Sequence, residues 1–96
     1  MLQTESPKER IHTMISSVVF TMVDKPDSVK ISSVENPQDN SMLFGLTVDK
    51  TDLGKVIGKA GRNANALRVL INAVASKYGI RALLDIHNGQ PGVKST

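Results

Sequence analysis

The first clear pattern in the chain is a stripe of apolar residues that recur every three or four positions. They are Ile11, Met14, Ile15, Val18 and Met22. This spacing places them on one face of an amphipathic helix. Ser6 precedes Pro7 and stands three residues before Glu9, the order of a capping box with proline at the first helical position. The pattern predicts a helix that begins after Ser6 and ends in the turn at residues 24–27.

Strands are indicated by alternation. Residues 41–49 alternate most regularly, with Met42, Phe44, Leu46 and Val48 on one face. Residues 28–35 alternate more loosely, and residues 36–40 have the composition of a turn. A last short strand is predicted over residues 81–86.

Two more helices are predicted between the second and the last strand. The first covers residues 53–57, with Asp52 as its cap, and ends at Gly58. The second runs over residues 62–78 and is followed by Gly79, a residue type common just after a helix. Its apolar stripe consists of Leu67, Leu70, Ile71, Val74 and Tyr78.

The resulting order, α-β-β-α-α-β, predicts an α+β domain of two layers. Three amphipathic helices must bury their stripes, and a three-stranded sheet with one apolar face is the natural partner. We expect the helices on one face of the sheet and a domain over residues 6–86. Residues 1–5 and 87–96 are expected to be flexible ends.

Composition narrows the classes of protein. The chain has 96 residues and no cysteine, which excludes disulfides and thiolate metal sites. No apolar run approaches the roughly 20 residues of a membrane span, and the start lacks the features of a signal peptide. We expect a cytoplasmic protein of one domain, without a membrane span, a cofactor or a metal.

Catalysis has no support in the sequence. His12 falls on the polar side of the first helix and His87 at the end of the last strand, and both are expected to be solvated. No Ser-His-Asp, Cys-His or metal-spaced cluster is present. The prediction is that the protein is not an enzyme.

Charge is distributed unevenly along the chain. Eight of the nine acids lie in residues 1–52, whereas residues 53–96 hold seven Lys and Arg and one acid, Asp85. Six basic residues fall between Leu53 and Leu84 without an acid among them. Such a cluster is either a solvated helix face or a binding surface for polyanions. Its position around a glycine-rich loop favours the second interpretation.

That loop lies in the run Gly54-Lys55-Val56-Ile57-Gly58-Lys59-Ala60-Gly61. Residues 58–61, the GxxG loop, allow a phosphodiester backbone to come close to main-chain amides because glycine has no Cβ. Lys59 adds positive charge, and the helix that follows has an N-terminus that attracts anions.

Two other nucleotide-binding loops also contain closely spaced glycines, but neither fits this sequence. A nucleotide-hydrolase loop needs four residues between its glycines and a hydroxyl after the lysine. Here three residues separate Gly54 from Gly58, Ala60 follows Lys59, and the loop joins two helices rather than a strand and a helix. The dinucleotide fingerprint G-x-G-x-x-G is absent.

The motif Val56-Ile57-Gly58-Lys59-Ala60-Gly61, in this element order, resembles the signature of the type II KH domain. Residues 48–86 and the chain length are similar to the small single-KH proteins of bacteria, the KhpA-like family. Ala64 stands where many KH domains have a larger aliphatic residue, and the last ten residues have no counterpart. The resemblance implies binding of single-stranded RNA, a homodimer, and pairing with a larger Jag-type KH protein.

The resemblance also implies an RNA-binding surface around the GxxG loop, opposite the strand at residues 41–49. Amides of residues 59–61 would meet a phosphate, with Lys55, Lys59 and Arg62 supplying charge. Val56 and Ile57 would divide core packing and base contact, with Ile57 the more buried. Asn65 and Arg68 either line the rim or face solvent. The predicted RNA-binding residues are Lys55, Val56, Ile57, Gly58, Lys59, Ala60, Gly61, Arg62, Asn65 and Arg68.

Two functional classes remain open. The first is a single-stranded RNA-binding module, acting as a chaperone or a regulator, with single-stranded DNA as a variant ligand. The second is a protein-interaction subunit that uses the KH surface for dimerisation. The aromatic residues Phe20, Phe44 and Tyr78 fall on stripes that indicate core, so stacking platforms for bases are not expected.

Overall fold

The computed structural model describes residues 6–88 and has the predicted element order. The helices are α1 (Pro7–Met22), α2 (Leu53–Ile57) and α3 (Arg62–Lys77), with short 3-10 turns η1 (Pro26–Ser28) and η2 (Lys59–Gly61). The strands are β1 (Lys30–Asn36), β2 (Ser41–Val48) and β3 (Arg81–Asn88). The α+β prediction is therefore confirmed.

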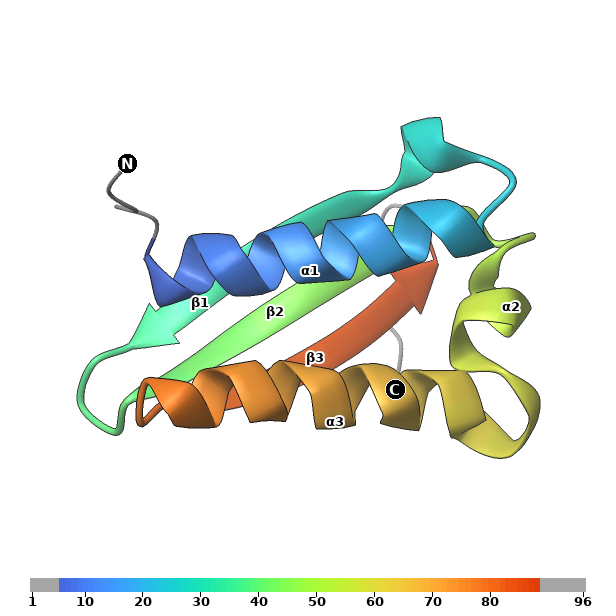
Figure 1. Cartoon of the computed structure of the whole chain (residues 1–96). Helices are drawn as coiled ribbons and strands as arrows, with labels where there is room; N and C mark the ends of the chain where they lie inside the picture. The colour runs from blue at the N-terminus through green and yellow to red at the C-terminus, as the bar shows by residue number, and fades with distance from the viewer. Residues whose placement is uncertain (1–5, 89–96) are drawn as a thin grey trace, which may run out of the picture.

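The three strands form one mixed sheet in the order β1-β2-β3. β1 pairs antiparallel with β2 through a tight turn, and β3 pairs parallel with β2 after the crossover through α2 and α3. Ser33, Phe44 and Leu84 lie side by side across the sheet. α1 and α3 run across one face of this sheet, and α2 lies at its end (Figure 1).

The start of α1 follows from local chemistry, as predicted. The Glu9 amide donates to Ser6 Oγ at 3.2 Å, and the Ser6 amide donates to Glu9 Oε1 at 3.0 Å. Both halves of the capping box are therefore present. The helix then buries Ile11, Ile15 and Val19 against the sheet.

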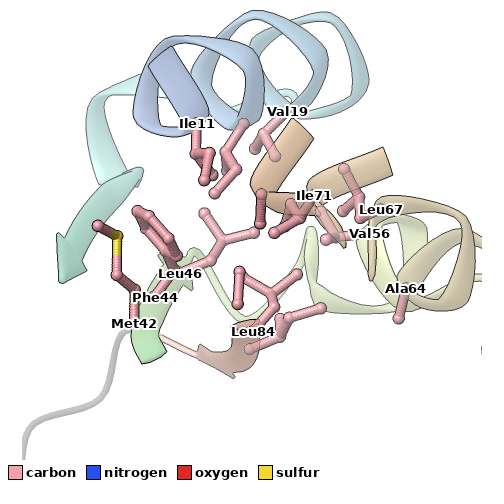
Figure 2. Packing of buried hydrophobic residues seen from close by; sticks show 14 of the residues in the cluster. Ile11, Val19, Met42, Phe44, Leu46, Val56, Ala64, Leu67, Ile71 and Leu84 are labelled. Carbon is pink, nitrogen blue, oxygen red and sulfur yellow. The ribbon is translucent and has the colours of Figure 1, made fainter. Parts of the chain in front are cut away.

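The core lies between the two helices and the covered face of β2 and β3 (Figure 2). Phe44, Leu46 and Val48 of β2 are fully buried, in line with the predicted alternation. α3 contributes Leu67 and Ile71 together with small alanines, which allow the helix to come close to the sheet. The fold is thus held by a single apolar layer.

Some details of the sequence prediction were wrong. Phe20 is 50% exposed and Leu70 is 46% exposed, although both were assigned to core stripes. The buried residues of α3 are Ala64, Leu67, Ile71 and Ala75. Leu70 lies to one side of this buried face. The prediction assigned Leu70 to the core because leucine is more hydrophobic than alanine. In the structure Ala64 and Ala75 are buried instead, because α3 packs closely against the sheet on that side.

The last strand is longer than predicted. β3 continues through His87 and Asn88, which the sequence reading assigned to the tail. The rest of the predicted flexible ends, residues 1–5 and 89–96, lies outside the described residues.

The second face of the sheet carries no helix within residues 6–88 (Figure 1). Val34, Leu43 and Leu83 are neighbours on this face, one from each strand, and all three are exposed. Among the described helices, none has the length and apolar character that crossing a membrane requires.

Candidate nucleic-acid interface

The GxxG loop turns the chain sharply between α2 and α3. Gly58 has φ 78° and ψ 168°, Ala60 has φ 55° and ψ 26°, and Gly61 has φ 75° and ψ 14°. Three of the four loop residues thus have positive φ, which L-residues rarely adopt. Lys59 and Ala60 at the tip are exposed. The corner therefore presents main chain rather than bulky side chains to solvent.

The two glycines are required for different reasons. A Cβ built on Gly58 would come within 2.7 Å of Asn63 Cγ and 2.8 Å of the Asn63 amide nitrogen. A Cβ on Gly61 would meet nothing within 4 Å. Gly58 is therefore constrained by space and by dihedral angles, whereas Gly61 is constrained by its left-handed conformation alone.

Part of the loop's main chain is already hydrogen-bonded internally. The Gly58 amide donates to the Gly54 carbonyl at 2.8 Å, which ends α2, and the Gly61 amide donates to the Gly58 carbonyl at 3.1 Å. The sequence reading gave the Gly61 amide to a phosphate. Because that amide has an internal partner, Lys59 and Ala60 are the better candidates for a phosphate contact.

Cations around the loop differ in their surroundings. Lys59 and Arg62 are exposed, and within residues 6–88 neither has a carboxylate at ion-pair distance. Lys55 is different, because its ammonium lies 2.5 Å from Asp24 Oδ2 and 3.0 Å from Asp52 Oδ1. The charge of Lys55 is thus compensated locally, whereas Lys59 and Arg62 present theirs to solvent.

Arg68 and Arg81 are also held by partners in the fold. Arg68 Nη2 donates to the Leu84 carbonyl of β3 at 3.2 Å, and Arg81 Nη2 lies 3.3 Å from Asp39 Oδ2. Arg68 is partly buried, whereas Asn65 is exposed. Arg68 therefore lies along the edge of β3, and Asn65 faces solvent.

The division of roles between Val56 and Ile57 is the reverse of the prediction. Val56 is fully buried and belongs to the core, whereas Ile57, the last residue of α2, is only partly buried. Leu53 and Val56 are three positions apart, so both lie on the face of α2 that turns toward the core. Ile57 is consequently the apolar side chain available next to the loop.

The strand that the prediction places opposite the loop, residues 41–49, lies in the middle of the sheet. β2 is the central strand and is paired on both sides, by β1 and by β3. β3 is the edge strand on the side of α3, which packs against it. The crossover through α2 and α3 places β3 beyond β2, so β3 rather than β2 is the outer strand on this side of the sheet.

Two residues that support the loop were missed by sequence reasoning. Asn63 Nδ2 donates to the Lys55 carbonyl at 2.7 Å and so joins the start of α3 to α2. Asp52 was predicted to cap α2 with its side chain, but it makes no such bond. Its carboxylate instead accepts from the Asp24 and Lys25 amides, each at 3.0 Å. No local sequence signal marks these contacts, since they join residues up to 28 positions apart.

Other chemistry at the surface is sparse. Within the described residues, no group of three or more His, Asp or Glu side chains has the arrangement to hold a metal ion. His12 is exposed on α1, and His87 Nε2 lies 3.5 Å from Asp85 Oδ2.

Comparisons with known proteins agree with this architecture. Residues 12–86 match the family described as KhpA/KhpB, KH domain. The chain is 42% identical over 74 residues to the RNA-binding protein KhpA of Halalkalibacterium halodurans, covering 77% of this chain and 95% of that protein. It is 44% identical over 73 residues to the RNA-binding protein KhpA of Listeria monocytogenes, covering 76% and 93%. For the RNA-binding protein KhpA of Chlamydia trachomatis the identity is 39% over 72 residues, covering 75% and 90%.

The matched segment contains β1, β2, α2 and α3, most of α1, and β3 except for its last two residues. Its order of elements is that of the type II KH fold, and the family is not one of enzymes. The expected resemblance is therefore confirmed at the level of fold and family. On this evidence the chain belongs to the KhpA/KhpB family of KH-domain proteins.

Proposed function

We propose that this protein binds single-stranded RNA at the GxxG loop and acts as an RNA chaperone or post-transcriptional regulator in the cytoplasm. One observation carries the proposal: an exposed corner of main chain with positive φ values, flanked by the exposed cations Lys59 and Arg62. Bacterial relatives that cover most of the chain are named RNA-binding proteins, which supports the choice of ligand.

In the proposed complex, a phosphate meets the amides of Lys59 and Ala60 while Lys59 and Arg62 supply charge. Gly58 and Gly61 hold the loop in shape, and Ile57 offers an apolar surface to a base. Val56 does not touch RNA and contributes by anchoring α2 in the core. Asn65 and Arg68 border the site along α3. With three or four phosphates engaged, the logarithm of affinity should fall with that of salt at a slope of about −2 to −3.

The test replaces Lys59 and Ala60 together with aspartate. Ala60 already has a left-handed conformation, which aspartate tolerates better than most residues, so the fold should survive. We expect crosslinking to RNA to collapse while the melting temperature and oligomeric state hold. The matched control replaces Ala73 and Lys77, an exposed pair on α3, in the same way. Crosslinking that persists in the loop variant at moderate salt would refute the assignment.

Single-stranded DNA is separated from RNA by competition. An excess of a DNA strand with the same sequence should displace the bound RNA poorly if sugar hydroxyls contribute to recognition. Equal displacement by both strands would assign the site to single strands in general.

A second candidate function is protein interaction, with a homodimer or a pairing with a larger Jag-type KH protein as its form. Two exposed apolar surfaces favour it. One is the pair Val69 and Leu70 on α3, and the other is the sheet-face group Val34, Leu43 and Leu83. Exposed apolar side chains gathered in one place are typical of contact surfaces.

Sedimentation of the purified protein at micromolar concentration tests self-association. If the protein is a dimer, Leu70→Asp and Leu43→Asp show which surface forms the contact, since a charge there should dissociate it. A wild-type chain that sediments as a monomer at all concentrations would remove the homodimer from the proposal.

A further inference from the structure

Asp52 is a buried charged residue in a core that is otherwise apolar. It is fully buried, and among the described residues it is the one polar side chain in that class. Burying a carboxylate is costly unless it is hydrogen-bonded and paired with charge. The structure provides both, so the contacts of Asp52 indicate what the residue is for.

The carboxylate gathers donors from two distant parts of the chain. Its two oxygens accept the amides of Asp24 and Lys25, which follow the end of α1. Lys55, one turn into α2, adds its ammonium at 3.0 Å. Asp52 thus joins the C-terminal end of α1 to the first turn of α2.

Lys55 continues the connection toward the GxxG loop. Its ammonium bridges Asp24 and Asp52, which fixes the side chain against α1. Its carbonyl accepts the Asn63 side-chain amide at 2.7 Å. The Asn63 side chain lies against Gly58, in the space that a Cβ would need. A continuous series of contacts therefore runs from the end of α1 to the first glycine of the loop.

Electrostatics keeps this cluster charged. The hydrogen bond from the Asp24 amide is the main cause that lowers the pKa of Asp52 below 3.8, against the opposing effect of burial. The Asp24 carboxylate, followed by Asp52, raises the pKa of Lys55 above 10.5. The charged forms of Asp52 and Lys55 are therefore both favoured by their contacts in the fold.

We infer that Asp52, Lys55 and Asn63 are positioning residues, which hold the GxxG loop in its binding conformation without touching RNA themselves. The inference rests on the proposed function, and it changes the role of Lys55, which the sequence analysis placed among the RNA contacts. A lysine whose charge is already compensated by two carboxylates gains little from a phosphate and would lose its partners by moving to one. Lys59 and Arg62 are left to carry the electrostatic contact.

The salt dependence of binding distinguishes contact from positioning. Binding of a short oligouridylate is measured over a range of salt for wild type, Lys55→Gln and the matched control Lys59→Gln. Removing a phosphate contact should lower the slope of log affinity against log salt by about 0.7. We expect that loss for Lys59→Gln, whereas Lys55→Gln should weaken binding at every salt concentration with an unchanged slope. A slope reduced equally in both variants would overturn the inference.

A second measurement does not depend on RNA. In the free protein, ¹⁵N relaxation of the Lys59 and Ala60 amides reports the order of the loop. Asn63→Ala should lower their order parameters from about 0.85 toward 0.6. The matched control is Asn72→Ala, because Asn72 also donates to a main-chain carbonyl on α3, that of Arg68 at 2.9 Å. An unchanged loop in Asn63→Ala would overturn the inference.

A failure of the proposed RNA-binding function can be distinguished from a failure of the inference about loop positioning. If wild type binds neither RNA nor DNA, the proposed function falls, and relaxation still decides whether these residues order the loop. Asp52→Asn serves as a further variant, since it places an amide nitrogen opposite a main-chain N–H. Should it fail to fold, the exposed residue Asn63 still provides the test.

Discussion

Replacing Gly58 with alanine is expected to destabilise the protein by about 3 kcal/mol, and the same change at Gly61 by about 1 kcal/mol. Gly58 has φ 78° and ψ 168°, a region that is nearly restricted to glycine and costs other residues about 1–3 kcal/mol. The new Cβ would also lie 2.7–2.9 Å from three atoms of Asn63, one of them main chain. Displacing Asn63 would break its bond to the Lys55 carbonyl, worth about 0.5–1.5 kcal/mol.

Gly61 lacks the steric part of this cost. Its left-handed conformation penalises an L-residue by about 1–2 kcal/mol, but nothing lies within 4 Å of the new Cβ. Alanine also reduces the conformational entropy of the unfolded chain, which offsets about 0.4–1 kcal/mol of this destabilisation. Asparagine tolerates this conformation, so Gly61→Asn should be close to neutral.

Urea unfolding followed by circular dichroism measures these differences directly. In a domain of this size about 1 kcal/mol corresponds to a shift of roughly 4–8 °C in melting temperature, which gives an independent check. Gly54→Ala is the control, because Gly54 lies inside α2 with open space around it and alanine favours helix. Equal losses for Gly58→Ala and Gly61→Ala would show that the reasoning about Asn63 is wrong.

Three further outcomes are expected. Ala60→Gly should stabilise the fold by about 0.5–1 kcal/mol in urea unfolding. Glycine removes the penalty of a left-handed alanine, and the greater entropy of the unfolded chain offsets only part of this gain. A loss of stability would contradict this. Ser6→Ala should cost about 1 kcal/mol through the lost cap, and an unchanged melting temperature would show that the cap is not needed. The pKa of Asp52 is lowered in the fold, chiefly by the Asp24 amide, so its stabilising contribution is complete well above pH 3.8 and is lost as pH falls through the folded value. The urea midpoint should therefore drop at acid pH in wild type and drop less in Asp52→Asn. An equal drop in both proteins would show that Asp52 is not the cause of the acid sensitivity.

Much of the fold was predictable from short-range signals. The capping box at Ser6 and Glu9 set the start of α1, and the alternation in residues 41–49 set β2. The glycine pattern marked the loop. The predictions that failed share a different feature. Phe20 and Leu70 were placed by hydrophobicity alone, and their exposure depends on where neighbouring elements lie.

The candidate site shows the same division. Its position and its two exposed cations followed from the motif, and they remain the basis of the proposed function. Asn63 and Asp52 had no signal in the sequence, because an asparagine or an aspartate near a helix start has many ordinary roles. Their partners could be named only once the segment after α1 and the start of α3 were both placed beside α2.

The amino-acid sequence by itself determined which segments are helix or strand, their approximate extent, and where the chain turns at glycine. Such features depend on hydrogen bonds and side-chain contacts within about four residues, so local residue types suffice to specify them. The tertiary structure alone decided that Lys55 is paired with Asp24, 31 positions away, that Arg68 reaches the edge of β3, and that β2 is central. These pairings arise when all the apolar faces are buried together, and burial is a property of the whole assembly of helices and strands rather than of any one of them.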